Sequence, residues 1–169
     1  MRNKAVYLDN AASSFPKPKS VISAMTSFMK KNGANPGRSG HRLSEEAAEK
    51  VYETREKASE YFGTTPDGII FTKNATEALN LAIFSAAKRG FRSFLCSDAE
   101  HNSVLRPLAE VKAEYGAEID YFSFPNPDFD GKSPDVVICT AASNVTGNIA
   151  DIEKVSRFCK EKGCLLITD

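Results

Sequence analysis

Residues 93–124 read SFLCSDAEHNSVLRPLAEVKAEYGAEIDYFSF. The apolar run Ser93–Cys96 predicts a short strand. Apolar residues then recur at helical spacing, and Pro107 requires the helix to begin near Ser103. The residues that mark this helix are Val104, Leu108, Val111 and Tyr115. Ile119 to Phe124 predicts a second strand, so the stretch is a strand–helix–strand unit, which is typical of a parallel sheet.

The same alternation continues on both sides of this unit. We expect helices over residues 18–31, 44–62, 75–89 and 152–162, with Ser44 as the N-cap of the second. We expect strands over residues 69–72, 136–140 and 165–169. Strands that are apolar on both faces predict an α/β fold, with a mostly parallel sheet and helices on both faces. Residues 1–169 are expected to form a single domain, with residues 1–20 as an N-terminal arm.

The composition argues against several classes of protein. The chain has 169 residues with 22 basic and 22 acidic side chains, so its net charge of zero gives no electrostatic case for a nucleic-acid partner or an anionic membrane. No apolar run approaches the length of a membrane span, and the start MRNKAVYLD lacks the apolar core of a secretory signal. Four cysteines without a C-x-x-C pair argue against zinc and favour buried, reduced thiols in a cytoplasmic protein.

Several polar residues follow the predicted strands, where ligands bind in open α/β sheets. The amides of Ala75 and Thr76 open a helix after Asn74 and could hold a phosphate, or the segment could be an ordinary helix cap. His101 could be an acid–base group or an aromatic platform, or a surface histidine beside a helix.

Three further segments stand at candidate positions. Asn144 could donate a hydrogen bond to a ligand oxygen, or could belong to a polar turn. The loop 35–42 is glycine-rich and basic, and could reach an anionic ligand or simply connect two helices. Asp169 follows the last predicted strand, a natural functional position, so a chain that stops there is expected to be cut off from a longer sequence.

The order of these segments is similar to that of one known family. The segments are YLDNAA (7–12), NPG (35–37), HR (41–42), FTKNATEALN (71–80), EHN (100–102), SNVTG (143–147) and Asp169. Together they resemble the cysteine desulfurase-like branch of the class V aminotransferases, which are fold-type I enzymes that use pyridoxal 5'-phosphate (PLP). The resemblance covers the whole chain and implies part of the large domain of such an enzyme.

The resemblance implies roles for individual residues. Ala75 and Thr76 would bind the cofactor phosphate, and His101 would stack on the pyridine ring and take part in proton transfer. Asn144 would hydrogen-bond the 3-oxygen of the ring or the amino-acid substrate. Asp169 would pair with the protonated pyridine nitrogen and keep the ring able to accept electrons. His41 and Arg42 would lie near the substrate, in the active site of a dimer partner.

The chain departs from the family pattern where the covalent chemistry is held. The family's Schiff-base lysine lies in a Ser-x-His-Lys motif after the aspartate, whereas His41 and His101 are followed here by Arg and Asn. None of the cysteines matches the family's catalytic cysteine. The chain therefore resembles the first half of such an enzyme. We expect no desulfurase or transaminase turnover from it alone.

The missing half also affects the sheet. In the family, the strand at residues 69–72 would be separated from that at residues 165–168 by strands that this chain lacks, which leaves unpaired edges. We expect a partner, either a second copy or a complementing C-terminal half, or a rearranged sheet. The alternatives to an enzyme are a non-catalytic truncated α/β fragment and a weak PLP- or phosphate-binding module.

Overall fold

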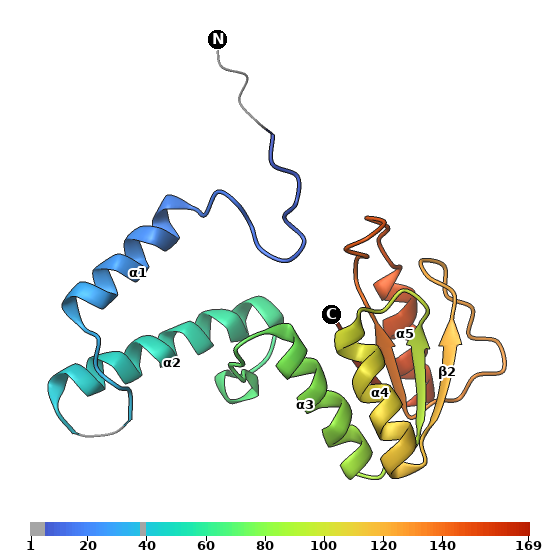
Figure 1. The fold of residues 1–169 in the computed structure, drawn as a ribbon. Helices are drawn as coiled ribbons and strands as arrows, with labels where there is room; N and C mark the ends of the chain where they lie inside the picture. The colour runs from blue at the N-terminus through green and yellow to red at the C-terminus, as the bar shows by residue number, and fades with distance from the viewer. Residues whose placement is uncertain (1–5, 38–39) are drawn as a thin grey trace. The chain divides into compact units, whose positions relative to one another are not determined.

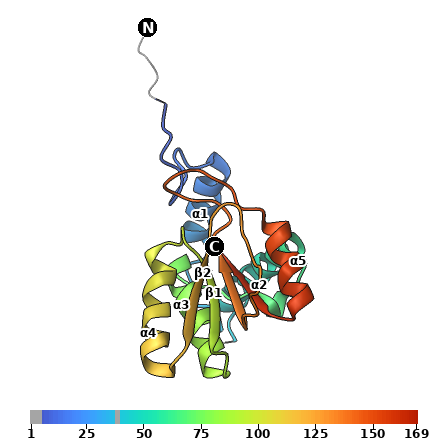
Figure 2. The same ribbon diagram turned by 90° about the vertical axis from the view of Figure 1, so that its right-hand side faces the viewer.

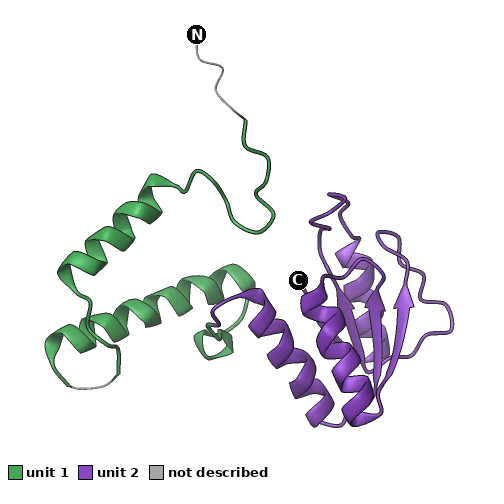
Figure 3. Ribbon diagram, in the orientation of Figure 1, with its two compact units in different colours: residues 1–71 green, residues 72–169 purple. Residues whose placement is uncertain are grey.

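The structure, a computed structural model, describes residues 6–37 and 40–169 (Figure 1). The chain divides into two compact units, residues 1–71 and residues 72–169 (Figure 3). The single domain over residues 1–169, with its arm over residues 1–20, stays a prediction.

The first unit is helical in its described part. It contains α1 (Lys19–Lys31), α2 (Arg42–Phe62) and a 3-10 turn, η1 (Pro66–Gly68). Both predicted helices are confirmed, but α2 begins earlier than predicted and Ser44 is not its N-cap. Nδ1 of His41 caps the helix by accepting a hydrogen bond from the Ser44 amide at 3.2 Å. The Ser44 hydroxyl is instead buried and donates to the carbonyl of Asn35 at 2.9 Å, so it serves the preceding loop.

The prediction of a strand over residues 69–72 is wrong. These residues pair with no strand in the described parts of the chain, and Ile70 and Phe71 are exposed. The side chain of Arg55, in α2, contacts this segment instead. Its guanidinium donates to the carbonyl of Ile69 and lies 5.1 Å from the centroid of the Phe71 ring. The physical reason is that an apolar run forms a strand only where a neighbouring strand can pair with its backbone.

Residues 72–169 contain a parallel sheet, as predicted, with four strands where the sequence indicates five. Its strands are β1 (Ser93–Ser97), β2 (Glu118–Phe122), β3 (Val136–Cys139) and β4 (Leu165–Thr168). They lie in the order β2-β1-β3-β4, and every neighbouring pair is parallel. Val136 of β3 lies opposite both Phe94 of β1 and Leu165 of β4. The observed ends differ from the predicted ones by about one or two residues, the ordinary uncertainty of strand ends.

Helices cover both faces of this sheet, as its apolar strands predict (Figures 1 and 2). α3 (Ala75–Lys88) and α4 (Asn102–Tyr115) pack on one face, and α5 (Ile152–Lys162) packs on the other. Successive residues of a strand point to opposite faces. The core under α3 and α4 contains Phe94, Cys96, Val136 and Ile138, and the core under α5 contains Leu95, Val137, Cys139 and Phe158.

The direction of the chain connections changes between β1 and β3. α4 links β1 to β2 on one side of this point, and α5 links β3 to β4 on the other side and across the opposite face. The segment after β1 therefore leads to one face of the sheet, and the segment after β3 leads to the other face. In open α/β sheets such a switch point forms a crevice at the carboxyl ends of the strands, where ligands bind.

Candidate functional site

The start of α3 offers unpaired backbone amides. Oδ1 of Asn74 caps the helix by accepting from the Glu77 amide at 2.9 Å, and Glu77 accepts in turn from the Lys73 amide at 2.9 Å. Neither the Ala75 amide nor the Thr76 amide has an acceptor among the described residues, and both residues are exposed. α3 runs back along the sheet into β1, so its start lies at the carboxyl edge of the strands. Two free amides at a helix N-terminus favour an anion such as a phosphate.

His101 lies at the N-cap of α4, directly after the β1 segment. Its Nδ1 accepts from the Ser103 amide at 3.1 Å and lies 2.9 Å from the Ser103 hydroxyl. A neutral imidazole that accepts at Nδ1 carries its proton on Nε2. Nε2 has no partner among the described residues, so an anchored but exposed ring remains available to a ligand at this edge.

Asn144 lies in the turn that follows β3. The hydroxyl of Ser143 accepts from the amides of Val145 at 3.3 Å and Thr146 at 3.2 Å, and the Gly147 amide donates to the Ser143 carbonyl at 2.9 Å. This turn holds Asn144 exposed, and its side-chain amide has no partner within the described residues. The sequence left two alternatives for Asn144, a polar turn or a hydrogen-bond donor to a ligand. The structure contains the turn, and the side-chain amide of Asn144 is free to donate from it.

Asp169 follows β4 at the same edge (Figures 1 and 2). Its backbone is tied to β3, because its carbonyl accepts from the Ala141 amide at 2.8 Å and its amide donates to the Cys139 carbonyl at 3.4 Å. Its side chain is exposed. The structure therefore brings Ala75, Thr76, His101, Asn144 and Asp169 to one edge of one sheet, while their individual roles stay predictions.

Glu100 is a residue of this edge that the sequence analysis did not single out as a site residue. The residue is 7% exposed, and its carboxyl group lies between the ends of β1 and β3. Oε1 accepts from the Ser97 hydroxyl at 2.5 Å and from the Thr140 amide at 2.5 Å. Oε2 is buried and has no hydrogen-bond partner among the described residues. The sequence does place an acidic residue three positions after a buried strand. This signal does not indicate a buried carboxyl group, because acidic residues in such loops are usually exposed.

The surroundings of Glu100 favour its neutral form. Burial raises the pKa of its carboxyl group, and the charge of Asp169 raises it further, whereas the hydrogen bonds from Ser97 and Thr140 lower it. The net direction is upward. Buried carboxyl groups near a ligand edge are candidates for functional residues.

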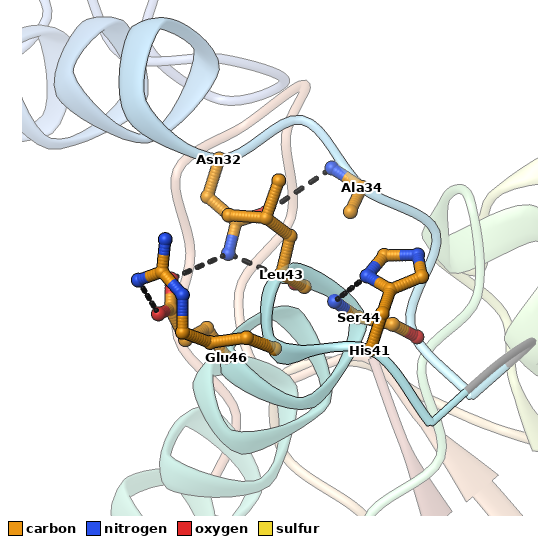
Figure 4. A network of polar contacts seen from close by, with 7 residues as sticks. Asn32, Ala34, His41, Leu43, Ser44 and Glu46 are labelled. Atoms are coloured by element: carbon orange, nitrogen blue, oxygen red, sulfur yellow. Dashed lines mark hydrogen bonds and ion pairs between the residues drawn. The ribbon is translucent and has the colours of Figure 1, made fainter.

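His41 and Arg42, the predicted substrate residues, belong to the first unit, and each interacts with a residue close to it in sequence. Figure 4 shows His41 beside Ser44, and Asn32 bonded to Glu46. His41 caps α2, and Arg42 forms an ion pair with Glu46 at 2.7 Å. The other carboxylate oxygen of Glu46 accepts from the Asn32 side chain at 3.2 Å, and Asn32 is buried. The structure shows how these side chains are held, and their approach to a substrate stays a prediction.

The three buried cysteines provide no activated thiol. Cys96, Cys139 and Cys159 are buried and Cys164 is half-buried, and all are free, which confirms the predicted buried thiols for three of the four. Burial raises the pKa of Cys139 and of Cys159 to about 12, and raises that of Cys96 strongly. A thiol with a raised pKa is a poor nucleophile at neutral pH.

The described residues contain neither a membrane-spanning helix nor a metal-binding cluster. Over residues 6–37 and 40–169, no helix has the length and apolarity that a membrane crossing needs. In the same ranges, no group of three His, Cys, Asp or Glu side chains is arranged to hold a metal ion.

Comparison with known families agrees with this arrangement. The family model for aminotransferase class-V matches residues 6–169. The chain belongs to the class V aminotransferase family. Members of this family depend on PLP, so the match supports the cofactor that the sequence implied.

The relatives of this class V chain that we compared are cysteine desulfurases. A probable cysteine desulfurase of Methanothermobacter thermautotrophicus is 32% identical over 97% of this chain and 43% of its own length. The cysteine desulfurase IscS of Dictyoglomus turgidum is 34% identical over 98% of this chain and 44% of its own length. The apo structure of a cysteine desulfurase from Thermococcus onnurineus NA1 superposes with a TM-score of 0.84 at 28% identity, over 94% of this chain and 42% of the other.

This class V chain therefore spans less than half the length of the relatives it matches. The residues that it contains nevertheless fit PLP in chemical type. The unpaired amides of Ala75 and Thr76 suit a phosphate group. The exposed carboxylate of Asp169, at the same edge of the sheet, suits a protonated pyridine nitrogen.

Proposed function

We propose that this chain forms the cofactor-binding part of a PLP-dependent, cysteine desulfurase-like enzyme that acts on a small amino acid. The observation that carries the proposal is the gathering of free amides, an anchored imidazole and an exposed carboxylate at the switch point of a class V sheet. Bound PLP supplies an electron sink for a substrate carbanion, and the protein supplies binding and orientation.

Each residue of the edge has a definite task in this proposal. The Ala75 and Thr76 amides and the Thr76 hydroxyl bind the phosphate, aided by the dipole of α3. Asp169 would accept a hydrogen bond from the protonated pyridine nitrogen, and its negative charge would keep the proton on the ring. The ring of His101 lies against the cofactor and holds a proton at Nε2, and Asn144 donates to an oxygen of the ligand.

The proposal includes no turnover by these 169 residues alone. The sequence has no Ser-x-His-Lys motif, and its buried cysteines lack an activated thiol. A second copy of the chain cannot supply these groups, because its sequence is the same. We therefore infer that the lysine and the catalytic cysteine come from further polypeptide, either in the same chain as these residues or in a separate one, whether or not the chain also forms a homo-oligomer.

The first experiment measures PLP binding to the 169-residue chain. Calorimetry gives the dissociation constant, and the ³¹P signal of PLP reports on its phosphate. Thr76→Ala should weaken binding and shift this signal, whereas Ser85→Ala removes an exposed hydroxyl further along the same helix and should change neither. Asp169→Asn should weaken binding without moving the phosphate signal. The absence of binding by the unmodified chain would reject the proposal in favour of a non-catalytic fragment.

A second experiment separates a binding module from part of an enzyme. Cysteine and PLP are added to the chain, and alanine and sulfide are measured with and without the C-terminal portion of a related desulfurase. We expect products only in the mixture. Products from the chain alone would contradict the proposed need for residues beyond these 169, and binding without products in either case would indicate a PLP-binding module.

A further inference from the structure

Glu100 occupies the switch point of the sheet. The chain leaves β1 and β3 in different directions there. The Thr140 amide therefore has no backbone carbonyl of a neighbouring strand as its acceptor. The carboxyl group of Glu100 takes that place. A single oxygen, Oε1, accepts from Ser97, the last residue of β1, and from Thr140, the first residue after β3. Glu100 therefore joins the carboxyl ends of the two central strands.

The second oxygen of Glu100 favours a protonated carboxyl group. Oε2 is buried without a hydrogen-bond partner, and no ion pair among the described residues includes Glu100. The titratable groups that face it are Asp169 after β4, Cys96 of β1 and Cys139 of β3, none of which is a cation. An ionised oxygen that is buried without a partner or a nearby cation is strongly unfavourable.

The same contact is linked to two of the residues that are proposed to contact the cofactor, His101 and Asp169. His101 is the next residue after Glu100, so fixing Glu100 fixes the start of α4. Thr140 precedes Ala141, whose amide donates to the carbonyl of Asp169 at 2.8 Å. A movement of Glu100 would therefore change the position of His101 relative to Asp169.

We propose that Glu100 is a positioning residue that stays protonated in the folded protein and sets the distance between His101 and Asp169. This inference rests on the proposed function for its effect on PLP. When Glu100 is neutral, Asp169 is the one negatively charged carboxyl group of the pair Glu100 and Asp169, and it is the one proposed to face the pyridine nitrogen. An ionised Glu100 would repel the carboxylate of Asp169 and weaken the join between β1 and β3.

The first test needs no cofactor. Glu100→Gln keeps the size and the neutral form of the side chain, and Glu110→Gln changes an exposed glutamate of α4 as a control. A raised pKa in the folded state stabilises the protein fully below the unfolded pKa, and this advantage is lost as pH rises through the folded pKa. The stability of the unmodified chain relative to Glu100→Gln should therefore fall as pH rises, while Glu110→Gln should show no such trend. The opposite trend, or a carboxyl ¹³C titration of Glu100 at an ordinary pKa, would overturn the inference.

The second test follows positions by amide NMR and binding by calorimetry. Glu100→Leu removes the acceptor, and Glu100→Asp, which shortens it, serves if the leucine variant does not fold. Either should shift the amides of Thr140, Ala141 and Asp169, and should weaken PLP binding about tenfold, whereas Glu100→Gln should leave both nearly unchanged. Unchanged amides in Glu100→Leu and Glu100→Asp would overturn the positioning role.

The ring nitrogen gives a readout that distinguishes the two proposals. With ¹⁵N-labelled PLP, the pyridine signal should report a protonated nitrogen in the unmodified chain and in Glu100→Gln, and a smaller protonated fraction in Glu100→Asp. If the unmodified chain binds no PLP, the proposed function fails, while the amide shifts and the pH trend still decide the role of Glu100. If PLP binds equally to all variants, the proposed function stands and the positioning role fails.

Discussion

Two apolar runs of this chain, residues 69–72 (IIFT) and residues 136–139 (VVIC), look alike in sequence but differ in structure. Val136 to Cys139 form β3, with β1 on one side and β4 on the other, and all four residues are fully buried. Residues 69–72 pair with no described strand, and Ile70 remains 70% exposed. The difference lies in the partners, because a strand satisfies its backbone only through its neighbours.

The two runs also differ in how their ends are held. Asp135 precedes β3, and its carboxylate accepts from the amides of Arg92 and Ser93 at the start of β1, at 2.7 and 2.9 Å. The run at 69–72 has instead the guanidinium of Arg55 on the carbonyl of Ile69. One run is therefore part of a cooperative ladder, whereas the other is held by the side chain of Arg55 and by short-range bonds such as that from the Ile69 amide to the Pro66 carbonyl.

The largest effect is expected from the same substitution in both runs. Ile138→Ala removes a fully buried side chain from β3 and should lower the free energy of unfolding by about 2–5 kcal/mol. Ile70→Ala should change it by less than about 0.5 kcal/mol, because the side chain is already in water. Urea unfolding followed by circular dichroism measures both. Equal losses would show that residues 69–72 are packed in solution and would remove the contrast.

A smaller effect is expected at the amino end of the sheet. Asp135→Ala removes two hydrogen bonds to a charged group and should cost about 2 kcal/mol at neutral pH. These bonds hold the pKa of Asp135 below its ordinary value, so their stabilisation is present above the unfolded pKa and is lost as pH falls through the folded pKa.

The measurement for Asp135 is urea unfolding of both proteins from about pH 7 down to about pH 3. The difference between the unmodified chain and Asp135→Ala should shrink toward the acid end. Asp130→Ala, at an exposed position of the preceding loop, is the control and should have little effect at any pH. A difference that stays constant with pH would mean that the loss comes from packing and not from the carboxylate.

Most of the fold was predictable because its elements carry local signals. The helices have apolar spacing with caps, and the strands at 93–97 and 136–139 are apolar on both faces, which in a parallel sheet means burial on both faces. The run at 69–72 carries the same local signal. That residues 69–72 do not form a strand could not be predicted from their composition, because pairing depends on strands far away in sequence.

The positions of the candidate residues were predictable for a similar reason, while their roles stay predictions. Thr76, His101, Asn144 and Asp169 each follow a predicted strand or open a predicted helix, so topology alone brings them to one edge. Glu100 was missed because its role comes from a contact with Thr140, 40 positions away, across a switch point that only the strand order reveals. The cap formed by His41 was missed because Ser44 gave the more usual capping signal.

The smallest effect tests the side chain that holds the unpaired run. Arg55→Met keeps an unbranched side chain on α2 but removes the bond to Ile69 and the cation over Phe71, and should cost about 1 kcal/mol. Lys57→Met, at an exposed position of the same helix, should cost less than about 0.5 kcal/mol. Hydrogen exchange of the Ile69 amide, which donates to the carbonyl of Pro66 at 3.1 Å, should quicken in Arg55→Met and stay unchanged in Lys57→Met. Equal exchange in the two variants would show that residues 69–72 are held by something other than Arg55, and a partner strand from another polypeptide would then be the first explanation to test.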